Sequence, residues 1–175
     1  MDWENVILYT VIGAVITTMM YFVNKGANKA IETTNGVTEL RMNKFYQIVG
    51  YSALVIFLGF IVAAIYINET AFYIALIFIF LLFGGTGLAC VLWYRNHKII
   101  FDDDKITVYN WKKQVAEIYW EEITAIKFRP IAGNIKITGS NKIVKVHQHL
   151  VGLKTFIQKI EEETQWTARD LKLPF

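Results

Sequence analysis

Long uncharged apolar runs fill the first half of the chain, and short alternating runs fill the second half. The apolar runs extend from Val6 to Val23, from Ile48 to Ile67 and from Phe72 to Tyr94. None of them contains Asp, Glu, Lys, Arg or His. Because a helix needs about 20 mainly apolar residues to cross a bilayer, the pattern predicts three transmembrane helices within a membrane region over residues 1–95.

The start of the chain is acidic, with Asp2 and Glu4 before the first apolar run. A cleaved signal peptide has a basic segment at that place and a shorter apolar run. We therefore expect the first run to be kept as a membrane anchor.

The positions of Lys and Arg around the runs predict the orientation. The first connection carries Lys25, Lys29, Arg41 and Lys44, whereas the second connection, Asn68–Ala71, carries none. Cationic residues stay on the cytoplasmic side of a membrane. We expect a multi-pass membrane protein, with its N-terminus outside and its C-terminal half in the cytoplasm.

The first connection, residues 24–47, is long for a link between two helices. We expect a short helix around Ala27–Thr33 that ends near Gly36. The segment Leu40–Tyr46 then leads back into the membrane and alternates basic with apolar residues. It could rest on an anionic inner leaflet, or it could be a solvated linker whose lysines set the orientation.

After Arg95 the pattern becomes alternating, which is typical of strands. Polar turns separate the runs, and short strands at this regular spacing are typical of an antiparallel meander. A helical period follows and places Leu150, Leu153, Phe156, Ile157 and Ile160 on one face, up to Glu161–Glu163. The pattern predicts a small α+β domain over 96–164 and a tail over 165–175, with strands over 98–101, 106–111, 115–120, 123–128, 135–138 and 143–146.

Three short motifs in this half carry a resemblance. They are Trp120-Glu121-Glu122-Ile123, then Gly133-Asn134-Ile135-Lys136-Ile137, then Lys142-Ile143-Val144-Lys145-Val146 before an apolar helix. In this order they resemble a family of bacterial membrane proteins with a pleckstrin-homology-like (PH-like) domain, whose function is uncharacterised. The resemblance implies a location in a bacterial cytoplasmic (inner) membrane. It also implies a bent antiparallel sheet or barrel closed by a C-terminal helix, with Trp120 and Phe156 buried between them.

The composition narrows the classes of function. Hydrophobic residues make up 54% of the chain and charged residues 19%, with a net charge of +3. That charge is too small and too scattered for the basic face of a nucleic-acid-binding protein. The single cysteine, Cys90, excludes an intramolecular disulfide and a cysteine-based metal site. Apolar spans without buried charge also argue against a transporter or pump.

Candidate sites are few, and each has a structural alternative. The acidic turn Asp102–Asp104 stands where PH domains hold phosphates, so phosphoinositide binding is not expected; a solvated turn is favoured over a Ca²⁺ loop. His147 and His149 lack an evident third zinc ligand. Basic residues could face anionic lipid or a partner, or could only keep the domain soluble: Lys112, Lys113, Arg129, Lys136, Lys142, Lys145 and Lys154.

Small residues in the third span, Gly84, Gly85 and Gly87, are candidates for close helix packing. No arrangement of catalytic residues stands out, and we expect no enzyme activity, cofactor or metal. The expected function is a membrane-anchored interaction module at the cytoplasmic face, with membrane lipids and another membrane protein or a second copy as partners. Two alternatives stay open: an accessory subunit of a larger membrane complex, and a protein that protects the membrane against a pore-forming peptide.

Overall fold

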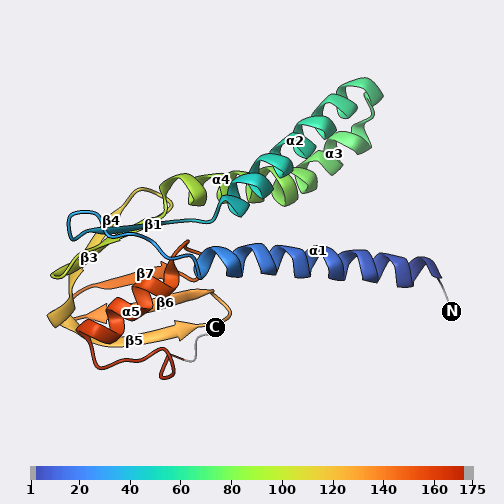
Figure 1. The fold of residues 1–175 in the computed structure, drawn as a ribbon. Helices are drawn as coiled ribbons and strands as arrows, with labels where there is room; N and C mark the ends of the chain where they lie inside the picture. Colours follow the sequence, from blue (N-terminus) through green and yellow to red (C-terminus); the bar gives the residue numbers. More distant parts are fainter. Residues whose placement is uncertain (1–2, 172–175) are drawn as a thin grey trace. The chain divides into compact units, whose positions relative to one another are not determined.

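The computed structural model describes residues 3–171 and, within the first helix, the side chains of only part of the residues. Of the tail predicted over 165–175, residues 172–175 lie outside the described residues. The chain divides into two compact units. One comprises Met1–Leu40, Ile99–Val108 and Ala116–Phe175, and the other comprises Arg41–Lys98 and Tyr109–Val115. Figure 1 names the helices and strands.

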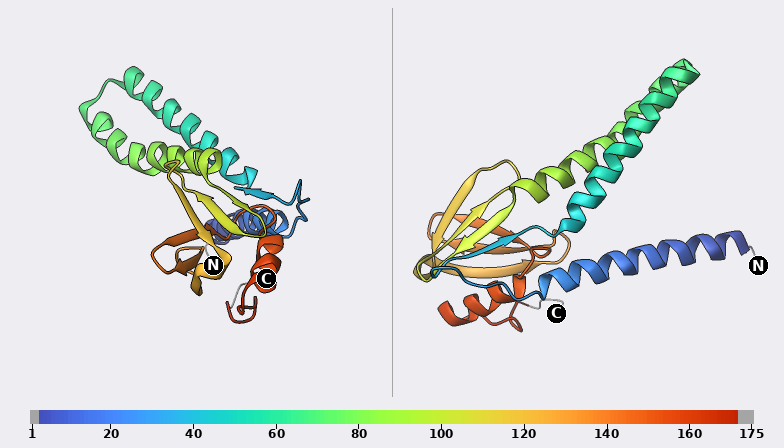
Figure 2. Two further views of the ribbon diagram at one scale, coloured as in Figure 1. Left: turned by 90° about the vertical axis from the view of Figure 1, so that its left-hand side faces the viewer. Right: turned by 45° about the horizontal axis from the view of Figure 1, so that its top comes forward.

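The second unit contains a helical hairpin. Helix α2 spans Lys44–Ile67, and a continuous helix over Thr70–Asn96 follows it as α3 (Thr70–Ile79), a π-helical stretch (Phe80–Gly85) and α4 (Thr86–Asn96). The two arms lie side by side in both views of Figure 2. Both are long and apolar enough to cross a membrane. The predicted helices over 48–67 and 72–94 are confirmed as helices.

Local signals set the ends of α2. The Asn43 side chain accepts a hydrogen bond of 2.9 Å from the backbone N–H of Phe45, which satisfies one of the free donors at a helix start. At the other end Asn68 adopts the left-handed conformation with φ 50°, which stops a helix. The turn between the two arms is therefore short.

Glycines bring the arms of the hairpin together. A Cβ atom added to Gly50 would lie 2.9 Å from the Gly87 carbonyl oxygen and 2.7 Å from Val91 Cγ2. A Cβ atom on Gly87 would lie 3.0 Å from the Gly50 carbonyl oxygen. Gly84 faces the rings of Phe57 and Phe80. The backbones of α2 and α4 approach this closely because neither carries a side chain at the crossing.

The strands form two sheets. One has the order β1–β2–β3–β4, and the other has the order β5–β6–β7. Helix α5 (Leu153–Glu163) follows the last strand. The bounds of the strands are β1 Thr38–Arg41, β2 Lys98–Phe101, β3 Lys105–Tyr109, β4 Val115–Tyr119, β5 Ile123–Arg129, β6 Asn134–Gly139 and β7 Ile143–His147. The six strands predicted after Arg95 are confirmed to within a few residues at their ends.

Strand β1 was not predicted, and the short helix expected around Ala27–Thr33 is wrong. Helix α1 (Trp3–Ala27) ends where that helix was expected to begin. Asn35 and Gly36 have positive φ angles of 53° and 78°, and they turn the chain between the bridged residues Thr34 and Val37. An Asn-Gly pair favours this tight turn. The chain then enters β1 and pairs with β2.

The pairing of β1 with β2 changes the domain organisation. The hairpin of α2 and α3–α4 lies between these two neighbouring strands in the sequence. The sheet domain therefore includes residues well before the predicted boundary at Asn96. Each end of the hairpin continues directly into a strand, since only Met42 and Asn43 separate β1 from α2 and only His97 separates α4 from β2.

Helix α5 buries its apolar stripe. Leu153, Phe156 and Ile160 have no exposed surface, and Trp120 is 5% exposed. The Trp120 and Phe156 rings lie 6.3 Å apart between centroids, so the predicted burial of both aromatics is confirmed. Leu150 is buried but precedes the helix, because Gly152 takes a positive φ of 80° at the N-cap.

Candidate functional site

The outward face of the three-stranded sheet carries a row of three lysines. Lys127 on β5 pairs directly with Lys136 on β6, and Lys136 pairs directly with Lys145 on β7. Directly paired residues have Cβ atoms about 5 Å apart. Lys127 and Lys145 are exposed, and Lys136 is half-buried between them. We call these three residues the lysine row.

Alternation along the strands produces this face. In β6 the residues Ile135 and Ile137 are fully buried, while Lys136 between them points outward. Their partners Val144 and Val146 on β7 are buried in the same way. Because successive side chains of a strand point to opposite faces, the apolar residues on one face require that the lysines share the other.

The rows on either side of the lysines are free of carboxylates. Towards the β5–β6 turn, Arg129 pairs with Asn134, and Asn134 pairs with His147. Towards the other end, the row is Ala125, Thr138 and Ile143. Among the described residues, Lys127, Arg129, Lys136 and Lys145 form no ion pair. The face therefore keeps its positive charge unneutralised.

An apolar side chain stands at the end of this face. Ile131 lies in the turn between β5 and β6, two residues beyond Arg129, and its side chain is fully exposed at 105%. Pro130 precedes it, and the N–H of Gly133 donates to the Pro130 carbonyl oxygen at 3.2 Å. The turn that follows Arg129 therefore holds an isoleucine in solvent.

The structure brings some of the predicted basic residues together and separates others. Arg129, Lys136 and Lys145 share the outward face of β5–β7. Lys142 lies exposed in the β6–β7 turn, and Lys154 lies exposed on α5. In the second unit, Lys112 and Lys113 lie exposed in the β3–β4 turn, where the Lys112 ammonium stands 5.0 Å from the centre of the Trp111 ring.

Sequence reasoning missed Lys127 and Ile131. Lys127 and Arg129 alternate with Ile126 and Phe128, so period-two spacing was enough to place both charges on one face. Ile131 follows a proline in a predicted turn, and an isoleucine there has no core to enter. The direct pairing of the three lysines depends on the register of β5–β7, in which alternation excludes a shift of one residue and the turns decide the rest.

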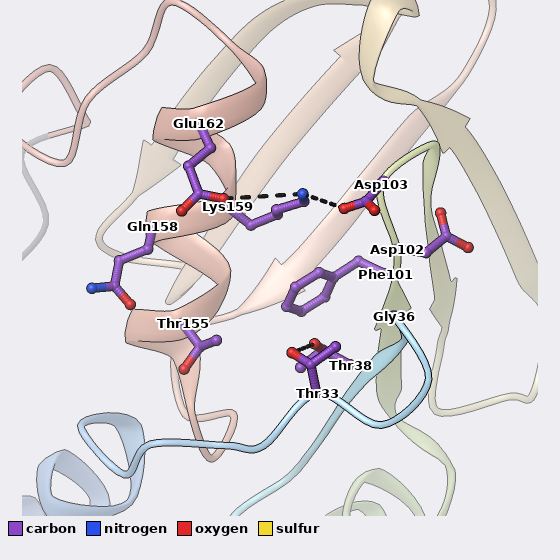
Figure 3. A pocket seen from close by; sticks show the side chains of 10 residues that line it. All are labelled: Thr33, Gly36, Thr38, Phe101, Asp102, Asp103, Thr155, Gln158, Lys159 and Glu162. Atoms are coloured by element: carbon purple, nitrogen blue, oxygen red, sulfur yellow. Dashed lines mark hydrogen bonds and ion pairs between the residues drawn. The ribbon is translucent and has the colours of Figure 1, made fainter.

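A cavity of about 220 Å³ lies beside α5, lined by residues of α5, β1, the β2–β3 turn and the segment before β1 (Figure 3). The Thr33 and Thr38 hydroxyl oxygens lie 2.8 Å apart within hydrogen-bonding distance. Lys159 is the cation that lines the cavity. Its ammonium lies 2.6 Å from Asp103 and 2.7 Å from Glu163.

The carboxylates around Lys159 decide the chemistry of this cavity. Hydrogen bonds that Lys159 donates to Asp103 and Glu163 raise the pKa of Lys159 above its ordinary value, so its charge is permanent. The same carboxylates neutralise that charge. The cavity therefore offers no open cation to a phosphate, and Lys159 instead links α5 to the β2–β3 turn.

The acidic turn Asp102–Asp104 is held by its own hydrogen bonds. Asp102 Oδ1 accepts from the N–H groups of Asp104 and Lys105, each at 2.9 Å. The Asp102 carbonyl oxygen accepts from the Trp120 indole N–H at 3.0 Å. This geometry is a side-chain-stabilised turn, and its hydrogen bond to the Trp120 indole holds that buried ring in place.

His147 and His149 are the histidines considered as metal ligands from the sequence. His147 and His149 have ring centroids 4.9 Å apart, and His149 Nε2 lies 3.0 Å from Gln148 Nε2. Burial lowers the pKa of His149. Across the described residues, no three His, Cys, Asp or Glu side chains gather around a point where a metal ion could bind.

In comparisons with known proteins, no family model, no curated protein and no solved structure matches the chain.

Proposed function

We propose that this chain is a multi-pass membrane protein whose sheet domain acts as a non-enzymatic interaction module at the cytoplasmic face of a bacterial cytoplasmic membrane. The observation that carries the proposal is the insertion of an apolar hairpin between β1 and β2. Both arms of the hairpin are long and apolar enough to span a bilayer. Two neighbouring strands of the sheet continue from its ends, which would hold the domain at the surface.

The proposal includes a third span and an orientation. Helix α1 is 25 residues long and contains the apolar run Val6–Val23. Lys25 in the last turn of α1, Lys29 after it and Lys44 at the start of α2 favour a cytoplasmic first connection. The hairpin turn at Asn68 would then face outward, and the sheet domain would lie in the cytoplasm.

We further propose that the sheet domain has a PH-like arrangement. A four-stranded sheet, a three-stranded sheet and one C-terminal helix in this order support it. A PH-like fold serves many unrelated functions, so the function is argued from the exposed surface. The lysine row, with Arg129 beside it, is the described surface that best fits an acidic partner.

Topology reporters test the proposal. A reporter that is active only outside the cytoplasm is fused at Asn68 in one variant and after Phe175 in another. We expect activity from the first fusion alone, together with retention of the full chain in membranes after alkaline carbonate washing. Equal signals from both fusions, or release of the chain by carbonate, would contradict the proposed topology.

Partner proteins are tested by affinity purification of the full chain in mild detergent, followed by mass spectrometry. The full chain is required, because a fragment starting at Asn96 would lack β1 and leave β2 as an unpaired edge strand on that side. A membrane protein recovered in stoichiometric amount would identify the partner. Recovery of the tagged and untagged chain together would show self-association.

A further inference from the structure

We infer that the outward face of β5–β7 docks on an anionic phospholipid surface, with the lysine row on the headgroups and Ile131 inserted between them. The inference rests on the proposed function, since it assumes that the chain is held in a membrane. It adds the surface of the domain that makes the contact and the chemical class of its partner.

The charge of this face is the first argument. Lys127, Lys136 and Lys145 stand side by side although like charges in direct cross-strand pairs destabilise a sheet. None of them has a carboxylate partner among the described residues. An anionic surface would relieve this repulsion, and it would do so for all three lysines together.

The location of Ile131 is the second and independent argument. A fully exposed isoleucine in a turn gains nothing in water, but it would gain apolar surroundings at the level of lipid headgroups. Arg129 is the last residue of β5, and Ile131 follows it by two residues in the turn to β6. A basic residue and an exposed apolar residue therefore stand at the same end of the sheet, a combination found on surfaces that rest in a membrane interface.

The form of the face sets its selectivity. The lysines stand in a line on a sheet and do not converge on a cavity. They would therefore respond to the charge density of the lipid surface and would not recognise the shape of one headgroup. The acidic residues Asp103, Asp104, Glu121 and Glu163 gather instead around a hollow beside Trp120 and Tyr119. Carboxylates at that other place would be repelled by the same lipid, which favours one orientation of the domain.

The experiment uses the full chain with Cys90→Ala and a single new cysteine, Ile131→Cys, labelled with a polarity-sensitive fluorophore. The labelled protein is placed in nanodiscs of phosphatidylcholine alone or of phosphatidylcholine with phosphatidylglycerol. We expect a blue shift of the emission and protection from an aqueous quencher only with phosphatidylglycerol, and we expect high salt to reverse both.

Matched variants separate position from net charge. One variant carries Lys127→Gln, Lys136→Gln and Lys145→Gln, and its control carries Lys112→Gln, Lys113→Gln and Lys154→Gln. Both lose the same charge. Because each basic group near an anionic membrane contributes about fivefold to affinity, the first variant should shift the docking equilibrium by up to roughly a hundredfold. The control should dock like the parent.

A second label position reports on specificity. A label at Asn141, in the turn at the other end of β6, should stay exposed to the quencher. An unchanged Ile131 label in phosphatidylglycerol, or an equal effect of the two triple variants, would overturn the inference. So would a response to an acidic peptide that phosphatidylglycerol does not produce, since it would identify a protein partner. If the chain stays in carbonate-washed membranes while the label is silent, the inference alone fails and the proposed function stands.

Discussion

Lys136 and Lys145 are direct partners on neighbouring strands, so that two like charges stand side by side on β6 and β7. Lys127 repeats this relationship on the other side of Lys136. The central lysine therefore experiences two unfavourable pairs that the fold itself does not require.

Replacement of this central lysine should stabilise the protein. We expect Lys136→Glu to raise the free energy of unfolding by about 1 kcal/mol, because opposite charges in direct pairs stabilise a sheet and like charges destabilise it. Thermal unfolding of the full chain in detergent at low salt, followed by tryptophan fluorescence, measures the change. Lys142→Glu, in the β6–β7 turn, is the control and should change little; a lower midpoint for Lys136→Glu would contradict the role of the pairing.

Gly152 is the position where an added methyl group should do most damage. It has a positive φ of 80°, and a Cβ atom would clash with Ile31 Cγ1 and lie 3.1 Å from Leu40 Cδ2. Its N–H also donates to the Gly26 carbonyl oxygen at 3.0 Å. We expect Gly152→Ala to lower the free energy of unfolding by about 2–4 kcal/mol, as the sum of left-handed strain and overpacking.

The matched control for Gly152 is Gly36→Ala. Gly36 has nearly the same φ, 78°, but nothing lies within 4 Å of its added Cβ atom. It should therefore show the conformational cost alone, about 1–2 kcal/mol. Equal unfolding midpoints for the two variants would mean that the segment over residues 26–40 does not pack against the start of α5.

The close approach of Gly50 and Gly87 predicts that a larger side chain at this crossing pushes the two arms of the hairpin apart. Gly50→Leu should separate α2 from α4, because even a Cβ atom there would lie 2.7 Å from Val91 Cγ2. Gly59→Leu is the control, since nothing lies within 4 Å of that position in the same helix. The measurement is the yield of a short bifunctional thiol cross-link between single cysteines placed at Tyr46 on α2 and Trp93 on α4, whose rings lie 6.2 Å apart, in a Cys90→Ala background. A lower yield is expected for Gly50→Leu only, and equal yields would count against close packing.

His97 should make stability depend on pH. It is 6% exposed, its Nδ1 lies 2.7 Å from the Tyr109 carbonyl oxygen, and burial lowers its pKa below the ordinary 6.5. The folded state thus holds the neutral ring, and the unfolded state binds the proton more readily. The stability contributed by this group is fully present above pH 6.5 and is lost as the pH falls below that value.

Unfolding midpoints measured from about pH 8 to pH 5 test this sign. His149 also has a lowered pKa and adds a slope of the same direction, so the comparison is between the parent and His97→Asn. The asparagine amide can keep the donor to the Tyr109 carbonyl without titrating. A flatter profile for His97→Asn is expected, and an unchanged slope would assign the pH dependence to other groups.

Period and composition alone were enough to predict much of this protein. The uncharged runs over 48–67 and 72–94 could only be helices, because an apolar segment of that length must satisfy its backbone hydrogen bonds within itself. The six strands after Arg95 followed from alternation and polar turns. The burial of Phe156 followed from the apolar stripe of α5.

Strand β1 was decided by tertiary structure. Thr38–Arg41 carries one leucine among polar residues, and it is a strand because β2 supplies its hydrogen bonds from beyond the hairpin in the sequence. The Asn35-Gly36 turn was the local signal available. The start of α5 was likewise decided by packing, since Gly152 must leave room for Ile31 and Leu40.

For the lysine row, too, the sequence determined one part and the tertiary structure decided the other. Alternation in the sequence determined that Lys127, Lys136 and Lys145 each leave the core, since a lysine between two buried apolar residues has to point outward. Which lysine faces which was decided by the register of β5–β7, because a shift of one residue along any strand would have moved its whole set of side chains to the other face. The short turns that join β5 to β6 and β6 to β7, together with the shared apolar core beneath them, select that register.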